Sequence, residues 1–216
     1  MKAKEGWVKA VAICGSSRAG GNTEQLLKHA LDRLAKRGIE GRLVLLQWKI
    51  IHPCLHCGDC SVMCNGRCVI EGDDFPDVFK DLRQADVILI GAPVDSGAAV
   101  ASLKALLERA GRVASENGNL FSRKLGAPIA VVGREVSQHT LQRLLTWFPA
   151  QGITVPGSPA YPKGKGISPL ALQCDRGGEE AVEGLVDNLV WLAEKLAVPE
   201  TTPPAGHVTD DGKARR

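Results

Sequence analysis

The cysteines of this 216-residue chain are distributed unevenly, because five of the seven lie within residues 54–68. The five are Cys54, Cys57, Cys60, Cys64 and Cys68. In a reducing compartment, cysteines crowded in this way indicate metal or redox chemistry and not a disulfide framework. Of the other two, Cys174 lies far along the chain, and Cys14 ends an apolar run, which is typical of a small buried side chain.

The spacing within this cysteine segment favours an iron–sulfur cluster. Cys54, Cys57 and Cys60 place three thiolates on one compact loop, as in proteins that bind a [4Fe–4S] cluster. Cys64 would complete the spacing of bacterial ferredoxins, but in two-cluster ferredoxins that fourth cysteine binds the other cluster. We therefore expect Cys68 to be the fourth ligand. Two alternatives stay open, a structural zinc site held by four thiolates and a set of free thiols.

A second candidate site lies at residues 15–23, which read Gly-Ser-Ser-Arg-Ala-Gly-Gly-Asn-Thr between an expected strand and an expected helix. A helix N-terminus favours an anion, because its backbone N–H groups lack partners and its dipole is positive there. The loop lacks the Lys of a nucleotide-triphosphate loop and has Ser17 where a dinucleotide fingerprint needs glycine. Its hydroxyl, amide and guanidinium groups suit a terminal monophosphate such as that of FMN, although a plain turn and helix cap is the alternative. The expected phosphate ligands are Ser16, Arg18, Asn22 and Thr23.

Apolar β-branched runs and amphipathic helical patterns alternate along the chain. We expect strands at residues 8–14, 43–48, 85–91, 128–133 and 152–155. We expect helices at residues 23–37, 74–83, 99–113, 140–149 and 179–197. This alternation predicts an α/β fold with a doubly wound parallel sheet, in which the cysteine segment follows the second strand. Ligands of such sheets bind beyond the carboxyl ends of the strands.

The composition excludes several classes of protein. Apolar residues make up 44% and charged residues 24%, which is typical of a globular domain and excludes disorder as the main state. The net charge of +3, with dispersed basic residues, lacks the basic patch of a nucleic-acid binder. We find neither a transmembrane span nor a secretory signal, and we expect a cytoplasmic protein without membrane or nucleic-acid partners. We expect one domain over residues 1–198, with a cysteine-rich loop at 49–72, and a disordered tail at 199–216.

Several motifs together resemble the superfamily of NADPH-dependent FMN reductases and iron–sulfur flavoproteins. The matching residues, in order, are Gly15-Ser16-Ser17-Arg18, Asn22-Thr23, Pro53-Cys54, Cys57, Cys60, Gly66, Cys68, Asp73-Asp74, Ala85-Asp86, Ala92-Pro93-Val94, Ser96 and Lys104. The resemblance covers residues 7–113 and is weaker up to residue 197. It implies a flavodoxin-like fold with five strands in the order 2-1-3-4-5 and FMN as a cofactor.

The same resemblance places Pro93, Val94, Ser96 and Gly133 along the isoalloxazine ring of FMN. The chain departs from the family at Asp95, where an aromatic residue is usual, and after the fourth strand, where residues 133–138 replace a Gly-Gly-Gln-Glu-like loop. An anionic Asp95 near the ring would disfavour a negatively charged reduced flavin. The resemblance also implies a homodimer or homotetramer in which the cluster of one subunit faces the flavin of another.

These features predict an oxidoreductase that combines FMN with a [4Fe–4S] cluster and passes electrons between a carrier such as ferredoxin and an acceptor such as oxygen, peroxide or a quinone. The expected cluster ligands are Cys54, Cys57, Cys60 and Cys68, and no acid–base residue is assigned. The first alternative is a NAD(P)H-dependent FMN or quinone reductase whose cysteines hold no cluster. The second alternative is a non-catalytic binding module with a zinc-stabilised loop.

Overall fold

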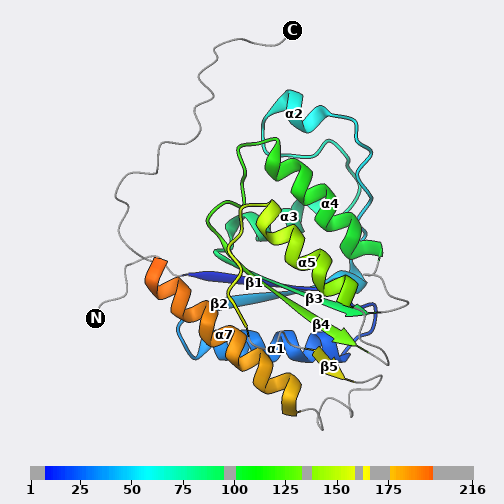
Figure 1. Ribbon diagram of the computed structural model, residues 1–216. Helices are drawn as coiled ribbons and strands as arrows, with labels where there is room; N and C mark the ends of the chain where they lie inside the picture. Colours follow the sequence, from blue (N-terminus) through cyan, green and yellow to red (C-terminus); the bar gives the residue numbers. More distant parts are fainter. Residues whose placement is uncertain (1–7, 95–100, 133–137, 159–162, 166–175, 197–216) are drawn as a thin grey trace.

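The computed structural model describes residues 8–94, 101–132, 138–158, 163–165 and 176–196. A parallel sheet lies at its centre (Figure 1), and its four long strands follow the order β2-β1-β3-β4. These strands are β1 (Lys9–Cys14), β2 (Glu40–Leu45), β3 (Val87–Val94) and β4 (Leu125–Val132). Their type, their order and the parallel α/β class agree with the prediction.

The prediction of a fifth strand at residues 152–155 is wrong. Thr154 makes a single bridge to Leu125, and Pro156, which has no backbone N–H, follows too soon for a ladder to continue. The segment that pairs with the outer edge of β4 is instead β5 (Lys163–Lys165), which has only three residues. Hydrophobic patterning could not locate β5, because a Lys-Gly-Lys segment has no apolar alternation.

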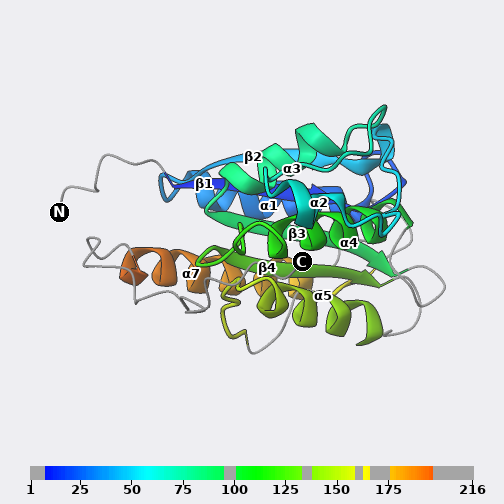
Figure 2. The same cartoon turned by 90° about the horizontal axis from the view of Figure 1, so that it is seen from above.

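Helices cover both faces of the sheet (Figures 1 and 2). On one face lie α1 (Asn22–Ala35) and α7 (Arg176–Leu196), which pack against each other. On the other face lie α3 (Phe75–Gln84), α4 (Ala101–Ser115) and α5 (Gln138–Ala150). This is the predicted doubly wound arrangement. Two short elements were not predicted, the 3-10 helix η1 (Leu46–Trp48) and, inside the cysteine segment, α2 (Asp59–Met63).

The sheet separates two apolar cores, because alternate side chains of a strand point to opposite faces. On β3, Ile88 and Ile90 belong to the core beneath α3, α4 and α5. Val87 and Leu89 belong to the core beneath α1 and α7. All four side chains are fully buried, as expected for a central strand of a parallel sheet with both faces covered.

An ion-pair network joins α1 to α7 at their partly exposed edge. Arg33 Nη2 lies 2.6 Å from Asp187 Oδ2, and Arg33 Nη1 lies 3.1 Å from Glu183 Oε2. The hydrogen bond from Arg33 lowers the pKa of Asp187, so this carboxylate is ionised at neutral pH. The network helps to fix α1, whose N-terminus follows the predicted phosphate loop.

The topology brings three loops to one edge of the sheet. Cys14 at the end of β1 pairs with Gly91 of β3, and Val94 at the end of β3 pairs with Val132 at the end of β4. The loops that follow these three strands therefore begin side by side, at the edge where ligands of such sheets bind.

In the described part of the chain, no helix is both long and apolar enough to cross a membrane. The predicted tail at residues 199–216 lies outside the described residues.

Candidate functional site

The loop after β1 is packed tightly against β3 and α4 at Gly15. The Gly15 N–H donates to the carbonyl oxygen of Gly91 at 2.8 Å, which continues the strand pairing by one residue. A Cβ atom on Gly15 would lie 2.7 Å from Leu103 Cδ2 of α4 and 3.2 Å from the Gly91 oxygen. Only glycine fits here without displacement of a neighbour, so the loop begins close to the sheet.

Hydrogen bonds within the loop and to the first turn of α1 fix the rest of the loop. Ser16 is buried, and its Oγ accepts a hydrogen bond from the Arg18 N–H at 3.1 Å. The Gly20 N–H donates to Glu24 Oε2 at 2.8 Å, and Gly20 has a φ of 63°, which favours glycine. These bonds define the backbone path before α1 begins at Asn22.

Glu24 carries its charge in the first turn of α1. Lys28 Nζ donates to Glu24 Oε1 at 2.6 Å, and this bond lowers the pKa of Glu24 although burial opposes the shift. The carboxylate is therefore ionised at neutral pH and interacts favourably with the positive end of the helix dipole. Lys28 offsets this charge, and Glu24 holds the Gly20 turn at the N-terminus of α1.

The four predicted phosphate residues lie together at this turn. Ser16 and Asn22 are each 6% exposed, whereas Arg18 is exposed. Thr23 is 2% exposed, and its methyl group lies so near Gly91 that a Cβ added there would come within 2.8 Å of it. Thr23 thus packs against β3 at the start of α1.

The predicted ring residues are described only in part. Pro93 is half-buried near the carboxyl end of β3, and Val94 is the last residue of that strand. Because β3 lies next to β1, the loop that follows Val94 starts beside the phosphate loop. Ser96 and Gly133, and the departing residue Asp95, lie outside the described residues.

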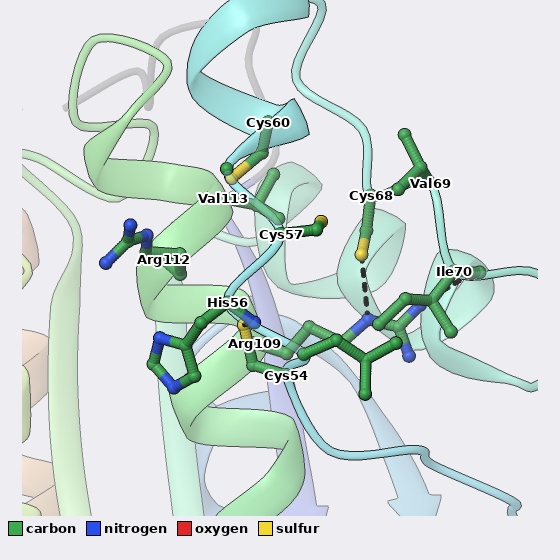
Figure 3. A pocket seen from close by; sticks show the side chains of 12 residues that line it. Cys54, His56, Cys57, Cys60, Cys68, Val69, Ile70, Arg109, Arg112 and Val113 are labelled. Atoms are coloured by element: carbon green, nitrogen blue, oxygen red, sulfur yellow. Dashed lines mark hydrogen bonds between the residues drawn. The ribbon is translucent and has the colours of Figure 1, made fainter.

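A pocket beside α4 is lined by all four cysteines that the sequence predicts as cluster ligands (Figure 3). They are Cys54, Cys57, Cys60 and Cys68. Cys60 is 8% exposed, and the other three are half-buried or exposed. Arg109 and Arg112 of α4 contribute to the wall of the pocket, so two cationic side chains lie beside the thiols.

Cys64 lies apart from this pocket. It ends α2 with a left-handed φ of 46°, its side chain is exposed, and its Sγ lies 2.9 Å from the carbonyl oxygen of Ser61. Of the two cysteines considered for the fourth position, the structure brings Cys68 to the pocket and not Cys64.

Helix α4 holds the cysteine segment through Arg109, whose side chain is fully buried. Arg109 Nε donates to Cys68 Sγ at 3.0 Å, and Nη2 donates to the carbonyl oxygen of Ile70 at 2.7 Å. Nη1 forms an ion pair with Asp73 and lies 3.4 Å from the carbonyl oxygen of His52. One guanidinium therefore joins both ends of the segment to the same point on α4.

Asn117, just beyond the end of α4, holds the middle of the segment. Its Oδ1 accepts a hydrogen bond from the Gly66 N–H at 2.7 Å. Its Nδ2 donates to the carbonyl oxygens of Cys60 at 3.2 Å and Val113 at 2.8 Å. Gly66 has a φ of 68°, and this left-handed turn directs the chain back from α2 toward Cys68.

Burial changes the chemistry of two of the thiols. It raises the pKa of Cys60 above the usual value, and the nearby positive charge of Arg112 opposes the shift. A metal group that binds Cys60 must therefore displace a proton from a buried thiol. Burial also raises the pKa of Cys14 to about 11, in the core beneath α1 and α7. Cys14 is thus the buried side chain that its apolar run predicts, and Cys174 lies outside the described residues.

The pocket gathers thiols without forming a closed metal site. Within the described ranges, no group of three or more Cys, His, Asp or Glu side chains could hold a metal ion. A zinc ion needs its four ligands about 2.0–2.3 Å from one point. A [4Fe–4S] cluster takes each thiolate on a different iron, so its cysteines surround a larger group. Four thiols are the donor type that such a cluster uses, and of the two arginines beside them Arg109 is paired with Asp73 and Arg112 lies 3.5 Å from Glu116.

Both candidate sites lie along α4. Leu103, near its N-terminus, packs against Gly15 of the phosphate loop, and Arg109 and Arg112 line the cysteine pocket. At 1.5 Å per residue, Leu103 lies about 9 Å from Arg109 and about 14 Å from Arg112 along the helix axis. The same rigid element therefore positions both sites and separates them within one chain.

Two residues that hold the cysteine segment, Arg109 and Asn117, and one that lines the pocket, Arg112, were not identified from the sequence. Arg109 carried a signal, because it interrupts the apolar stripe of α4, three residues after Leu106 and four before Val113. An arginine at such a position needs a buried partner. Arg112 and Asn117 carried no comparable signal, since polar residues are ordinary at their positions.

Comparisons with known proteins identify the family of this chain. Residues 8–168 match a family model described as NADPH-dependent FMN reductase. An iron–sulfur flavoprotein of Methanocaldococcus jannaschii is 34% identical over 152 residues, which are 69% of this chain and 76% of that protein. An iron–sulfur flavoprotein of Methanosarcina thermophila is 33% identical over 156 residues, which are 71% of this chain and 80% of that protein.

A solved structure shows the same fold at low sequence identity. RosB, with 8-demethyl-8-formylriboflavin-5'-phosphate bound, superposes with a TM-score of 0.70 at 16% identity, covering 97% of this chain and 95% of RosB. The likeness extends over almost the whole chain and supports the flavodoxin-like architecture. By the family model and by its relatives, this chain belongs to the NADPH-dependent FMN reductase family and, within it, to the iron–sulfur flavoproteins.

Proposed function

We propose that this flavin-dependent oxidoreductase binds FMN through residues 15–23 and a [4Fe–4S] cluster through Cys54, Cys57, Cys60 and Cys68, and that it exchanges electrons with a carrier such as ferredoxin. The observation that carries the proposal is the pocket beside α4, because it gathers these four thiols while Cys64 lies apart. The family supports FMN, and the names of the two relatives support an iron–sulfur group.

At the phosphate end, the N-terminus of α1 offers backbone N–H groups and the positive end of its dipole. The Ser16 hydroxyl, the Asn22 amide and the Thr23 hydroxyl add neutral hydrogen-bonding groups. The Arg18 guanidinium adds a positive charge and planar donors that suit phosphate oxygens. The Gly20 N–H is bonded to Glu24, so the hydroxyl, amide and guanidinium groups and the N–H groups at the start of α1 are the proposed donors to the phosphate.

At the ring end, Pro93, Val94, Ser96 and Gly133 are the proposed contacts to the isoalloxazine. The position of β3 and β4 beside β1 supports this assignment, since the loops after these strands start at one edge of the sheet. Asp95 replaces the usual aromatic residue, so less stacking is available to the ring from this chain. Because the protein binds the isoalloxazine ring less strongly, a larger share of the binding free energy of FMN comes from the phosphate contacts.

At the cluster end, the four cysteines are the proposed ligands, and Arg109 and Arg112 place positive charge beside them. FMN supplies two-electron and one-electron chemistry and the cluster supplies one-electron transfer, so together they convert between two-electron and one-electron partners. Electron transfer of this kind needs no general acid or base among the protein side chains.

The surface around the cysteine segment supports a homodimer or homotetramer. Six large apolar side chains between residues 48 and 69 are exposed in the described part of the chain, and exposed apolar side chains that gather on one surface mark interaction sites. They are Trp48, Ile50, Leu55, Val62, Met63 and Val69. A second copy of the chain that covers this surface would bring the cluster of one subunit toward the flavin of another.

The second candidate function is a NAD(P)H-dependent FMN or quinone reductase whose cysteines hold no cluster. The description of the matching family as NADPH-dependent favours this candidate. The two functions make different demands on the cysteine segment, because hydride transfer from a nicotinamide to FMN does not use the thiols. A zinc-stabilised binding module is less well supported, since the described cysteines do not converge on one ion.

Analysis of the anaerobically purified protein for iron, acid-labile sulfide, zinc and FMN tests the proposal. We expect about four iron and four sulfide with one FMN per chain, and no stoichiometric zinc. FMN without iron would favour the cluster-free reductase. Zinc without FMN would favour the binding module and would contradict the proposal.

A further inference from the structure

We propose that Arg109 is a positioning residue that raises the reduction potential of the cluster through its hydrogen bond to Cys68. The inference rests on the proposed function, because it requires a cluster that is bound through Cys68. It goes beyond that function by assigning control of the potential to a side chain of α4 that is not a ligand.

The orientation of the guanidinium is fixed by contacts on several sides. Its Cζ lies over the Phe75 ring, 4.0 Å from the ring centroid. Nη2 donates to the Ile70 carbonyl oxygen, and Nη1 forms the ion pair with Asp73. With both terminal nitrogens held, Nε is directed at Cys68 Sγ at 3.0 Å (Figure 3). Few rotamers satisfy all four contacts, so this bond is built into the fold.

The surroundings make this bond electrostatically strong. The side chains of Arg109 and Asp73 are both 0% exposed, so solvent screens their charges little. Within the part of the chain that the structure describes, Arg109 is the only buried cationic residue. Arg112, the other arginine of the pocket, is 41% exposed and lies 3.5 Å from Glu116, so its effect is screened.

Reduction adds one negative charge to an iron–sulfur cluster, and hydrogen bonds to the sulfurs are one of the factors that set its potential. A buried N–H donor on Cys68 stabilises the more negative, reduced state. Asp73 acts in the opposite direction, because its buried negative charge disfavours reduction and partly offsets Arg109. Removing the donor should therefore lower the potential, and removing the carboxylate charge should raise it.

Two conservative substitutions separate this role from a merely structural one. Arg109→Lys keeps the positive charge, but one ammonium group cannot reach Asp73, Ile70 and Cys68 together, so Cys68 loses its donor. Asp73→Asn keeps an oxygen that can accept the bond from Arg109 and removes the negative charge. Arg83→Lys is the matched control, because Arg83 contacts the Gly66 carbonyl oxygen and the Phe79 ring but no sulfur.

The test is an anaerobic redox titration of the purified holoprotein, with the reduced cluster followed by electron paramagnetic resonance. At the midpoint potential of the wild type, we expect the reduced-to-oxidised ratio to fall at least tenfold in Arg109→Lys, a shift of 59 mV for one electron. We expect the ratio to rise in Asp73→Asn and to stay unchanged in Arg83→Lys. General loosening of the pocket would instead move both substitutions in the same direction.

Shifts of the same sign, or no shift in either variant, would overturn the inference while leaving the proposed function intact. If Arg109→Lys fails to retain iron, Asp73→Asn decides the question alone, since an unchanged or lowered potential there would overturn the inference. Wild-type protein without iron and sulfide would overturn the proposed function itself, and the inference with it.

Discussion

Substitution of Gly15 by alanine tests whether the loop after β1 binds the phosphate of FMN. The new methyl group would lie 2.7 Å from Leu103 Cδ2, 3.1 Å from Leu103 Cβ and 3.2 Å from the Gly91 carbonyl oxygen. The Leu103 methyl can move, but its Cβ and the Gly91 backbone cannot move without shifting α4 or β3. Overpacking of this kind costs about 1–3 kcal/mol.

If FMN binding requires the native position of the loop, the cost of this overpacking is subtracted from the binding free energy of FMN. A cost of about 1–3 kcal/mol corresponds to a 5- to 150-fold increase in the Kd of FMN. Riboflavin, which lacks the phosphate, should lose much less affinity. Titration of the apoprotein with each compound, followed by quenching of flavin fluorescence, measures both constants, and Leu103→Ala in the Gly15→Ala background should restore part of the affinity for FMN.

Gly41→Ala is the matched control for this substitution. Its added Cβ would also collide with a leucine, Leu31 of α1, but Gly41 pairs with Ala10 at the opposite end of β1 from the loop. It should lower the melting temperature without changing the Kd of FMN. An equal loss of FMN and riboflavin affinity in Gly15→Ala, or no loss of either, would refute the assignment of the phosphate to this loop.

Three further predictions follow from individual side chains. Cys68→Ser should lose most of the bound iron, whereas Cys64→Ser should retain it, because of these two cysteines only Cys68 lines the pocket. The reverse result in iron analysis would assign the fourth ligand to Cys64. Cys14, with its pKa of about 11, should resist iodoacetamide at pH 8 in the folded protein and react after unfolding; mass spectrometry of the alkylated protein checks this, and rapid labelling of the native state would contradict its burial. Arg33 lowers the pKa of Asp187 in the folded protein. The ion pair therefore stabilises the fold at pH values above the unfolded-state pKa of this carboxyl, and this stabilisation is lost as the pH falls through the lower folded-state pKa. Asp187→Asn should thus lower the melting temperature slightly at pH 7 and have little effect in strong acid, and equal effects at both pH values would count against the pair.

Much of the fold could be predicted from the sequence because its elements carry clear periodic patterns. The buried run Val87, Ile88, Leu89 and Ile90 has the continuous apolar character of a parallel strand, and the structure places it at the centre of the sheet. β5 could not be predicted, since its three residues are determined by pairing with β4 and not by an apolar face of their own.

The two sites were predictable to different extents. Cysteine spacing indicated which thiols lie together, since three of them share one short loop. The contacts that hold this loop depend on Arg109 and Asn117, which are distant in sequence and become neighbours only when α4 packs over the segment. The requirement for glycine at position 15 could not be predicted from the sequence either, because the side chain that leaves no room for a Cβ there is Leu103 of α4.

If one chain binds both FMN and a [4Fe–4S] cluster, an anaerobic reductive titration of the purified protein counts the electrons of both cofactors. We expect uptake of about three electron equivalents per chain, two by the flavin and one by the cluster. We expect Cys68→Ser to take up about two. Uptake of only two equivalents by the iron-replete wild type, or of none, would contradict the proposal that one chain binds both.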